Sequence, residues 1–238
     1  MIADTRQFTD AALLAIASLL PIVNPLGGAP VFLLKTTDID DAARGVMARR
    51  VARNCFFLLL ASVLIGAYVL DLLSLSVNVV RVAGGLVVCS IAWSLLHQDD
   101  PPTLPARDAA RVASPDDLAQ RAFYPLTMPL TVGPGSISVA ITLGANQPSE
   151  LRPLVLIIAA HALGILVVTV VIYLCYRYAD RVLVRLGRTG TSVLLRLSAF
   201  ILLCIGVQIV WNGAAQLLGM PRWWFRFRQW LVTSRRRY

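Results

Sequence analysis

The sequence predicts an all-α membrane protein with six transmembrane helices, arranged as two inverted three-helix repeats in which helices 1 and 4 are discontinuous. Of its 238 residues, 57% are hydrophobic and only 15% are charged, and the charged residues avoid long apolar blocks. A block of about 20 apolar residues is what a helix needs to cross a hydrocarbon core of ~30 Å. Two of the blocks share one proline pattern, which is typical of paired broken helices in transporters.

Six blocks are apolar and long enough to span a bilayer. They cover residues 11–34, 54–73, 77–96, 123–143, 154–176 and 197–218. A soluble chain of this length would show more surface charge and more amphipathic patterning. The chain is therefore expected to divide into a first repeat (1–97), a polar, Pro-rich linker (98–122), a second repeat (123–219) and a basic aromatic tail (220–238).

The distribution of basic residues predicts the topology. The loops 35–53, 97–122 and 177–196 would share one side of the membrane and contain thirteen Lys and Arg residues. The N-terminus and the loops of the other side contain only Arg6, Arg81 and Arg152. By the positive-inside rule the first side is cytoplasmic, so both termini are expected to be periplasmic. The tail adds six arginines on the outer side, mixed with Trp and Phe as in an interfacial segment.

The N-terminus lacks the basic region of a signal peptide, so the first helix is expected to be retained. The net charge of +9 comes from arginines that flank the apolar blocks, which favours a lipid bilayer rather than nucleic acid as the partner. The four cysteines lie inside apolar blocks and form no CxxC pair. The sequence therefore predicts no metal site and no cofactor.

The first apolar block contains a stretch that cannot form a regular helix. Residues 21–30 read Pro-Ile-Val-Asn-Pro-Leu-Gly-Gly-Ala-Pro. Each proline removes a backbone donor and clashes with the preceding turn, and each glycine loosens the backbone. Backbone groups freed at membrane depth must face protein, water or a ligand rather than lipid. A broken helix in a bilayer is therefore a candidate functional site.

The fourth apolar block repeats this break 104 residues later. Pro21, Pro25, Leu26 and Pro30 correspond in spacing to Pro125, Pro129, Leu130 and Pro134. Three helices per repeat is an odd number, so the second repeat enters the membrane from the opposite side. Interrupted helices at matching positions of inverted halves indicate the substrate site of a transporter, near the bilayer midplane.

The two breaks carry no charged side chain, yet their backbone ends suit a zwitterion. Helix N-termini offer N–H groups and a positive dipole end to a carboxylate, and exposed carbonyls suit an ammonium group or a cation. We expect the side chains of Asn24 and Thr131 to touch the substrate. The full set of predicted substrate-binding residues is Asn24, Pro25, Gly27, Gly28, Pro30, Pro129, Thr131, Gly133, Pro134, Gly135 and Ser136.

Few polar side chains lie in the other blocks. His161 is a candidate for proton coupling, or it bonds a neighbouring backbone carbonyl. Gln208 and Asn212 share one helix face, and they either line the transport path or bond across helices. No Asp or Glu lies in a helix core, so coupling to H⁺ through His161, coupling to Na⁺ through carbonyls, and facilitated diffusion all stay open. Gly84 and Gly85 predict close helix packing.

The residues also resemble a known family. Asn24-Pro25-Leu26-Gly27-x-x-Pro30 and Pro125-Leu-x-x-Pro129-Leu-x-x-Gly133-Pro134-Gly135 resemble the first-helix and fourth-helix signatures of the MarC family of bacterial inner-membrane proteins. Arg81-Val-Ala-Gly84-Gly85 and Val207-Gln208 also fit its pattern. The family is similar to SnatA-type transporters of small neutral amino acids. The resemblance implies a multi-pass protein of the inner membrane that moves glycine and alanine.

The expected function is therefore secondary transport of small neutral amino acids by alternating access around the two breaks. The alternatives are export of other small metabolites and a non-transporting membrane scaffold or regulator. An enzyme is not expected, because the sequence contains no HExxH, GxSxG or Walker A motif, no Cys/His cluster, and only two histidines.

Overall fold

The computed structural model describes residues 2–97, 115–145 and 151–219. Helices form nearly all of this part of the chain. In order they are α1 (Ile2–Val23), α2 (Pro25–Leu34), α3 (Asp41–Leu72), α4 (Val77–Leu96), α5 (Pro115–Arg121), η1 (Ala122–Thr131), α6 (Pro134–Ala145), α7 (Leu151–Arg177) and α8 (Ala179–Leu217). The predicted tail and most of the predicted linker lie outside the described residues.

Five helices, α1, α3, α4, α7 and α8, are long and apolar enough to cross a membrane. The segment Leu118–Thr131 and α6 are bent by 75° relative to each other, and together they would form a sixth span. Their outward faces carry large exposed hydrophobic side chains, as lipid-facing surfaces do; examples are Phe57, Ile65, Leu86, Trp93 and Val193. An all-α membrane protein with five to six spans is therefore confirmed.

Three helices begin well before the apolar blocks that predicted them, and the first is α1, which starts at Ile2 rather than 11. α3 starts at Asp41 rather than 54, where the Ala43 N–H donates to the carboxylate of Asp40 at 2.7 Å and caps the helix. Its 32 residues extend about 48 Å, longer than a ~30 Å hydrocarbon core. α8 starts at Ala179 rather than 197 and changes direction at Gly187, whose φ of +66° suits glycine. Hydropathy marks only the apolar part of each helix.

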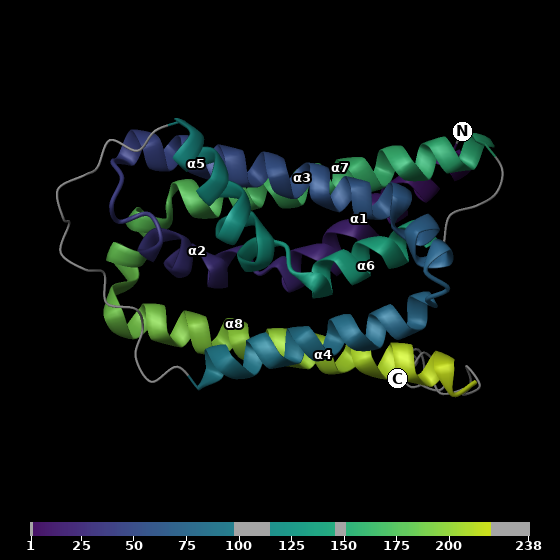
Figure 1. Cartoon of the computed structure of the whole chain (residues 1–238). Helices are drawn as coiled ribbons and strands as arrows, with labels where there is room; N and C mark the ends of the chain where they lie inside the picture. Colours follow the sequence, from purple (N-terminus) through teal and green to yellow (C-terminus); the bar gives the residue numbers. More distant parts are fainter. Residues whose placement is uncertain (1, 98–114, 146–150, 220–238) are drawn as a thin grey trace, which may run out of the picture.

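The interrupted elements occupy the middle of the molecule. α1, α2 and α6 lie between a pair formed by α3 and α7 and a second pair formed by α4 and α8 (Figure 1). Fully buried side chains, among them Leu19, Phe32, Met47, Leu59 and Tyr176, form the core between α1, α2, α3 and α7. The outer helices therefore shield the irregular backbone from lipid, as a bilayer requires.

α4 and α8 pack with their backbones almost in contact. A β-carbon added to Gly85 would lie 3.0 Å from the carbonyl oxygen of Gly206, and one added to Gly206 would lie 3.0 Å from the backbone nitrogen of Cys89. Gly213 approaches the carbonyl oxygen of Asn78 in the same way. The glycine pair of α4 is thus matched by glycines of α8, the small-residue packing common in membranes.

Basic side chains hold the connection between α2 and α3. Arg121 donates to the carboxylate of Asp38 at 2.7 Å and to the Lys35 carbonyl at 2.7 Å. The buried Arg44 donates to the Thr36 carbonyl at 3.2 Å, and Arg177 pairs with Asp41 at 3.1 Å. This segment is therefore fastened to α5 and α7, and residues from 41 onward are helical rather than loop. α1 begins and α8 ends at the opposite end of the bundle (Figure 1).

The glycine contact between α4 and α8 gives a stability prediction. Gly206→Val should lower the unfolding free energy by about 1–3 kcal/mol, because its new carbon meets backbone atoms that cannot move aside. Gly190→Ala is the control, since the added carbon there meets only the side chain of Leu186 on the same helix. Thermal unfolding of the purified proteins in detergent measures both. Equal unfolding temperatures for Gly206→Val and wild type would contradict the packing.

Candidate functional site

The first break is a single residue. α1 ends at Val23, Asn24 has a left-handed backbone with φ 45° and ψ 60°, and α2 begins at Pro25. Pro25 has no N–H, so the carbonyl of Pro21 lacks its helical donor. The side-chain oxygen of Asn24 accepts a hydrogen bond from the Gly27 N–H at 3.2 Å. Asn24 therefore both makes the turn and caps the second helix, two roles to which asparagine is well suited.

The second break is longer and has a different shape. Tyr124 and Met128 have extended backbones, with φ and ψ of −124° and 123° and of −122° and 123°. Each precedes a proline, which disfavours the helical conformation of the residue before it. The chain then bends by 75° into α6, which begins at Pro134. Met128 occupies the position that Asn24 holds in the first break, so the equivalent residues are both non-helical but adopt different conformations.

Threonine hydroxyls add hydrogen bonds to backbone carbonyls within η1. Thr127 Oγ1 donates to the Ala122 carbonyl at 2.6 Å, and Thr131 Oγ1 donates to the Leu126 carbonyl at 2.6 Å. Both threonines are buried. These bonds keep the polar hydroxyls of both threonines hydrogen-bonded inside the protein, as membrane depth requires.

The two breaks meet around one cavity of about 110 Å³, here called the break cavity. Eight of the eleven predicted binding residues line it: Asn24, Gly27, Gly28, Pro129, Thr131, Gly133, Gly135 and Ser136. Apolar side chains complete the wall: Ile22, Val23, Val31, Val88, Ile91, Leu95, Leu130 and Leu202. The structure therefore brings together two segments that lie about a hundred residues apart in the sequence.

The three remaining predicted residues shape the breaks without lining the cavity. Pro25 and Pro134 are the first residues of α2 and α6, where a proline lacks only a donor that the helix does not use. Pro30 is buried inside α2. Whether the lining residues bind a substrate stays a prediction.

The electrostatic character of the break cavity comes from backbone groups. The first turns of α2 and α6 both line it, through Gly27 and Gly28 and through Gly135 and Ser136. The N–H groups of Gly27 and Gly28 already donate to Asn24, whereas those of Gly135 and Ser136 in the first turn of α6 have no partner among the described residues. The helix dipole makes both helix ends positive. No charged side chain is among the described residues of the wall. The arrangement favours a small anionic group held by backbone donors.

Tyr176 of α7 joins the two breaks, and the sequence analysis did not identify it. Its side chain is fully buried and stacks on Phe32 of α2, with ring centroids 4.5 Å apart. Its hydroxyl lies 2.8 Å from Thr131 Oγ1. Because Thr131 donates its only hydroxyl proton to Leu126, Tyr176 must be the donor in this bond. A tyrosine at the end of an apolar block carries no sequence signal of such a role.

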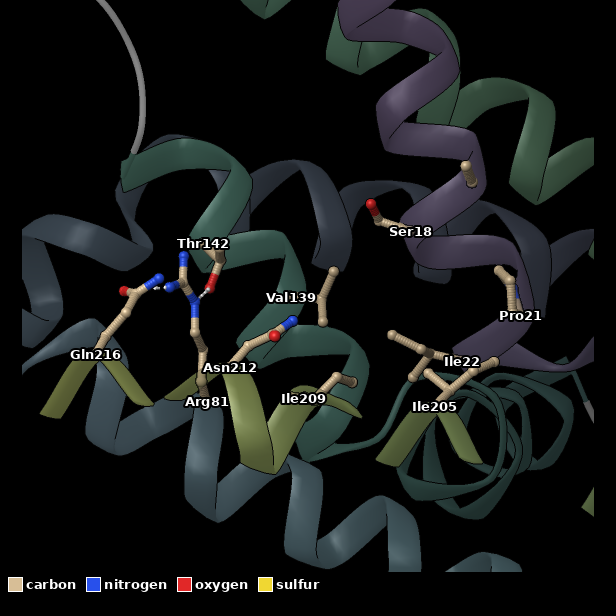
Figure 2. Close-up of a pocket in the computed structure, with 11 residues that line it drawn as sticks. Ser18, Pro21, Ile22, Arg81, Val139, Thr142, Ile205, Ile209, Asn212 and Gln216 are labelled. Atoms are coloured by element: carbon tan, nitrogen blue, oxygen red, sulfur yellow. Dashed lines mark hydrogen bonds between the residues drawn. The ribbon is translucent and has the colours of Figure 1, made fainter. Parts of the chain in front are cut away.

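A second, larger cavity of about 580 Å³ lies beside the break cavity, and we call it the vestibule (Figure 2). Ile22 lines both cavities. Helices α1, α4, α6 and α8 form the walls of the vestibule, through Ala17, Ser18, Pro21, Ile22, Arg81, Val139, Thr142, Ile205, Ile209, Asn212 and Gln216. Ile22 therefore lies at the boundary between the two cavities.

The other polar residues singled out in the sequence lie in different places. Asn212 lines the vestibule, and Gln208, which is exposed, donates to its side-chain oxygen at 2.9 Å. His161 is buried, and its Nδ1 atom has no hydrogen-bond partner among the described residues. It lines neither cavity. The role of His161 in coupling stays a prediction.

The fold and the cavities define a polytopic integral membrane protein with an internal site built on two broken helices. Residues 9–218 match the MarC family integral membrane protein profile. The chain is 30% identical to a UPF0056 membrane protein of Methanocaldococcus jannaschii over 84% of this chain and 94% of that protein. It is 28% identical to the UPF0056 inner membrane protein MarC of Salmonella typhimurium and 29% identical to that of Escherichia coli, in each case over 86% of this chain and 94% of the relative. The chain belongs to the MarC family. No solved structure matches it.

The contact between Gly28 and Tyr176 predicts that removing the tyrosine hydroxyl makes room for a larger residue at position 28. A β-carbon on Gly28 would lie 2.7 Å from the tyrosine hydroxyl but 3.5 Å from the nearest ring carbons. Gly28→Ala alone should therefore destabilise the protein, and Tyr176→Phe alone should cost about 1 kcal/mol through the lost hydrogen bond to Thr131. In the Tyr176→Phe background, Gly28→Ala should be nearly neutral.

Thermal unfolding of the four proteins forms a double-mutant cycle that isolates this coupling. Strictly additive effects of the two substitutions would show that Gly28 and Tyr176 are not in contact.

Proposed function

We propose that this protein is a secondary transporter of small neutral amino acids, such as glycine and alanine, working by alternating access around the two breaks. The observation that carries the proposal is the break cavity, in which two helix N-termini meet with no charged side chain in the described wall. The free N–H groups at the start of α6 and the positive dipole ends of both helices suit a carboxylate. The Gly27 N–H, which would be the helical donor to the Val23 carbonyl, instead bonds Asn24, so this carbonyl is available to an ammonium group.

The size of the break cavity supports a small substrate. Sites for drug-sized ligands measure roughly 300–1,000 Å³, whereas this cavity measures about 110 Å³. Its remaining wall is apolar, which suits a short aliphatic side chain or none. Asn24 adds a directional group: its amide nitrogen makes no hydrogen bond to a described residue, while its oxygen caps α2. In this proposal the amide nitrogen donates to the substrate carboxylate.

The packing of the helices supports two inverted repeats. A two-fold axis in the membrane plane would exchange α1 and α2 with η1 and α6, α3 with α7, and α4 with α8. Such an axis requires that α1 pack on α7 as η1 packs on α3, and that α2 pack on α7 as α6 packs on α3, and all four contacts are present. It also requires α4 and α8 to pack on each other, as they do. Transport would then involve movement of one repeat against the other around a fixed site.

The proposed membrane is the bacterial inner membrane, with both termini on the periplasmic side. The relatives from Salmonella and Escherichia are named inner membrane proteins. The start of α1 and the end of α8 lie at one end of the bundle (Figure 1). Described basic residues gather at the other end, including Lys35, Arg44, Arg121 and Arg177. A cytoplasmic location of that end follows from the positive-inside rule.

Uptake of radiolabelled glycine and alanine by the purified protein in liposomes tests this function. Uptake should exceed that of empty vesicles with a proton gradient, a sodium gradient or counterflow as the driving force. If uptake equals that of empty vesicles under all three conditions, the proposal is wrong.

Gly133→Ala tests the site itself. A β-carbon at Gly133 has space, since its nearest neighbour is the Pro129 carbonyl oxygen at 3.4 Å, and it would occupy part of the cavity. We expect alanine uptake to fall by roughly tenfold more than glycine uptake, as for one methyl group in a tight pocket. Gly190→Ala, outside the cavity, should leave the ratio unchanged. An unchanged ratio in Gly133→Ala would place the substrate elsewhere.

The energy source is a separate part of the proposal, with H⁺, Na⁺ or no coupling ion as alternatives. His161 is the titratable candidate in the helix cores, yet it lines neither cavity. We therefore expect His161→Gln to keep the wild-type dependence of uptake on pH, measured with and without a pH gradient. If the variant lost gradient-driven uptake but kept counterflow, His161 would be the coupling residue.

A further inference from the structure

Arg81 places a positive charge in the vestibule, and its hydrogen-bond partners among the described residues are all neutral. Its Nε donates to Thr142 Oγ1 at 3.0 Å, and its Nη1 donates to Gln216 Oε1 at 2.8 Å and to Asn78 Oδ1 at 3.2 Å. These partners come from α6, α8 and α4. Figure 2 shows the guanidinium between Thr142 and Gln216, with the Asn212 side chain entering the same cavity. The charge is thus held in place by three elements.

Other described arginines that bond to side chains have a carboxylate as the partner. Arg121 pairs with Asp38 at 2.7 Å, and Arg177 pairs with Asp41 at 3.1 Å. No described carboxylate pairs with Arg81, which is half-buried at the start of a membrane-spanning helix. Ionisable groups within membrane segments are costly and mark substrate or ion pathways. A fixed cation with neutral partners, facing a cavity of about 580 Å³, is suited to a mobile anion.

The vestibule also contains hydrogen-bond donors of Arg81 and Asn212 that make no bond to a described residue. A guanidinium has five N–H donors, and the three bonds of Arg81 use those of Nε and Nη1, which leaves Nη2. Gln208 donates to Asn212 Oδ1, which leaves the Asn212 amide nitrogen as a donor toward the vestibule. A guanidinium edge with an added amide donor suits a carboxylate, which accepts several hydrogen bonds.

We propose that Arg81 and Asn212 form a carboxylate-binding station in the vestibule, which holds the transported solute before it enters the break cavity. The inference rests on the proposed function and adds a second, outer binding site to it. Its position fits this order: Arg81 near the start of α4 and Gln216 near the end of α8 line the terminal end of the bundle, and Ile22 separates the vestibule from the break cavity. The solute would pass from a charged arginine to uncharged helix N-termini.

Binding of three radiolabelled probes to the purified protein in phosphatidylcholine nanodiscs tests the station. The probes are alanine, propionate, which keeps the carboxylate alone, and ethylamine, which keeps the amine alone. Wild type should bind alanine and propionate but not ethylamine. Arg81→Gln should weaken propionate binding by at least about tenfold, and Arg81→Lys should keep part of it, since truncating one partner of a charged hydrogen-bonded pair has a large effect.

Two further variants make the result specific. Asn212→Leu removes the amide donor but leaves the three bonds of Arg81 intact, so it should also weaken propionate binding, and it gives the answer if Arg81→Gln fails to fold. Arg196→Gln, an exposed position with the same charge change, should bind as wild type does. Wild-type propionate affinity in Asn212→Leu and in a folded Arg81→Gln would overturn the inference. Equal binding of ethylamine and propionate to wild type would do so as well.

A lipid phosphate is the competing anion. Propionate binding should be similar in nanodiscs of phosphatidylglycerol and of phosphatidylcholine, and its loss in the anionic lipid would assign the vestibule to a headgroup and overturn the proposal. The liposome assay separates this inference from the transport function. Arg81-dependent binding without uptake by wild type would remove only the transport proposal. If Arg81→Gln took up the amino acids at the wild-type rate and with an unchanged KM, only the proposed binding station would be wrong.

Discussion

The backbone of a chain in a bilayer has to find its hydrogen bonds within the protein, and this constraint explains most of the structure. Three prolines in each break interrupt the regular helical hydrogen bonding. Side chains then complete the hydrogen bonding of the irregular backbone: Asn24 Oδ1 accepts the Gly27 N–H at the start of α2, and Thr127 and Thr131 donate to carbonyls in η1. Tyr176 then fixes the second break against α2. With these bonds made, the backbone can remain irregular inside the membrane and still border a cavity.

The same constraint determines where the other helices lie. Irregular backbone is tolerated only when protein covers it, so the broken elements take the central layer and the long helices cover them (Figure 1). On one side α4 and α8 do this as a pair joined by glycines. On the other, the large buried side chains of α3 and α7 fill the core. The α4–α8 pair therefore packs through close backbone contact, whereas the α3–α7 pair packs through large side chains.

The sequence was sufficient where one residue type has one physical effect. Apolar length predicted the spans. The pattern of prolines and glycines, which disrupt a helix wherever they occur, predicted the two segments that contribute eight residues to the wall of the break cavity. Helix ends were missed at Asp41 and Ala179, since a helix that leaves the hydrocarbon loses its apolar signature but not its hydrogen bonds. Tyr176 and the placement of Arg81 were missed because both depend on partners far away in the chain.

The unequal shapes of the two breaks have a consequence for the whole molecule. If inverted repeats had identical conformations, the protein would look the same from both faces of the membrane, and a central site would be equally reachable from each. Here the matching residues Asn24 and Met128 differ, one left-handed and one extended. The vestibule likewise lies at the terminal end, where Arg81 and Gln216 line it. Under the proposed transport function, matching motifs in unlike conformations would make the two membrane faces of the protein non-equivalent, so that the central cavity would be reached more easily from one face than from the other.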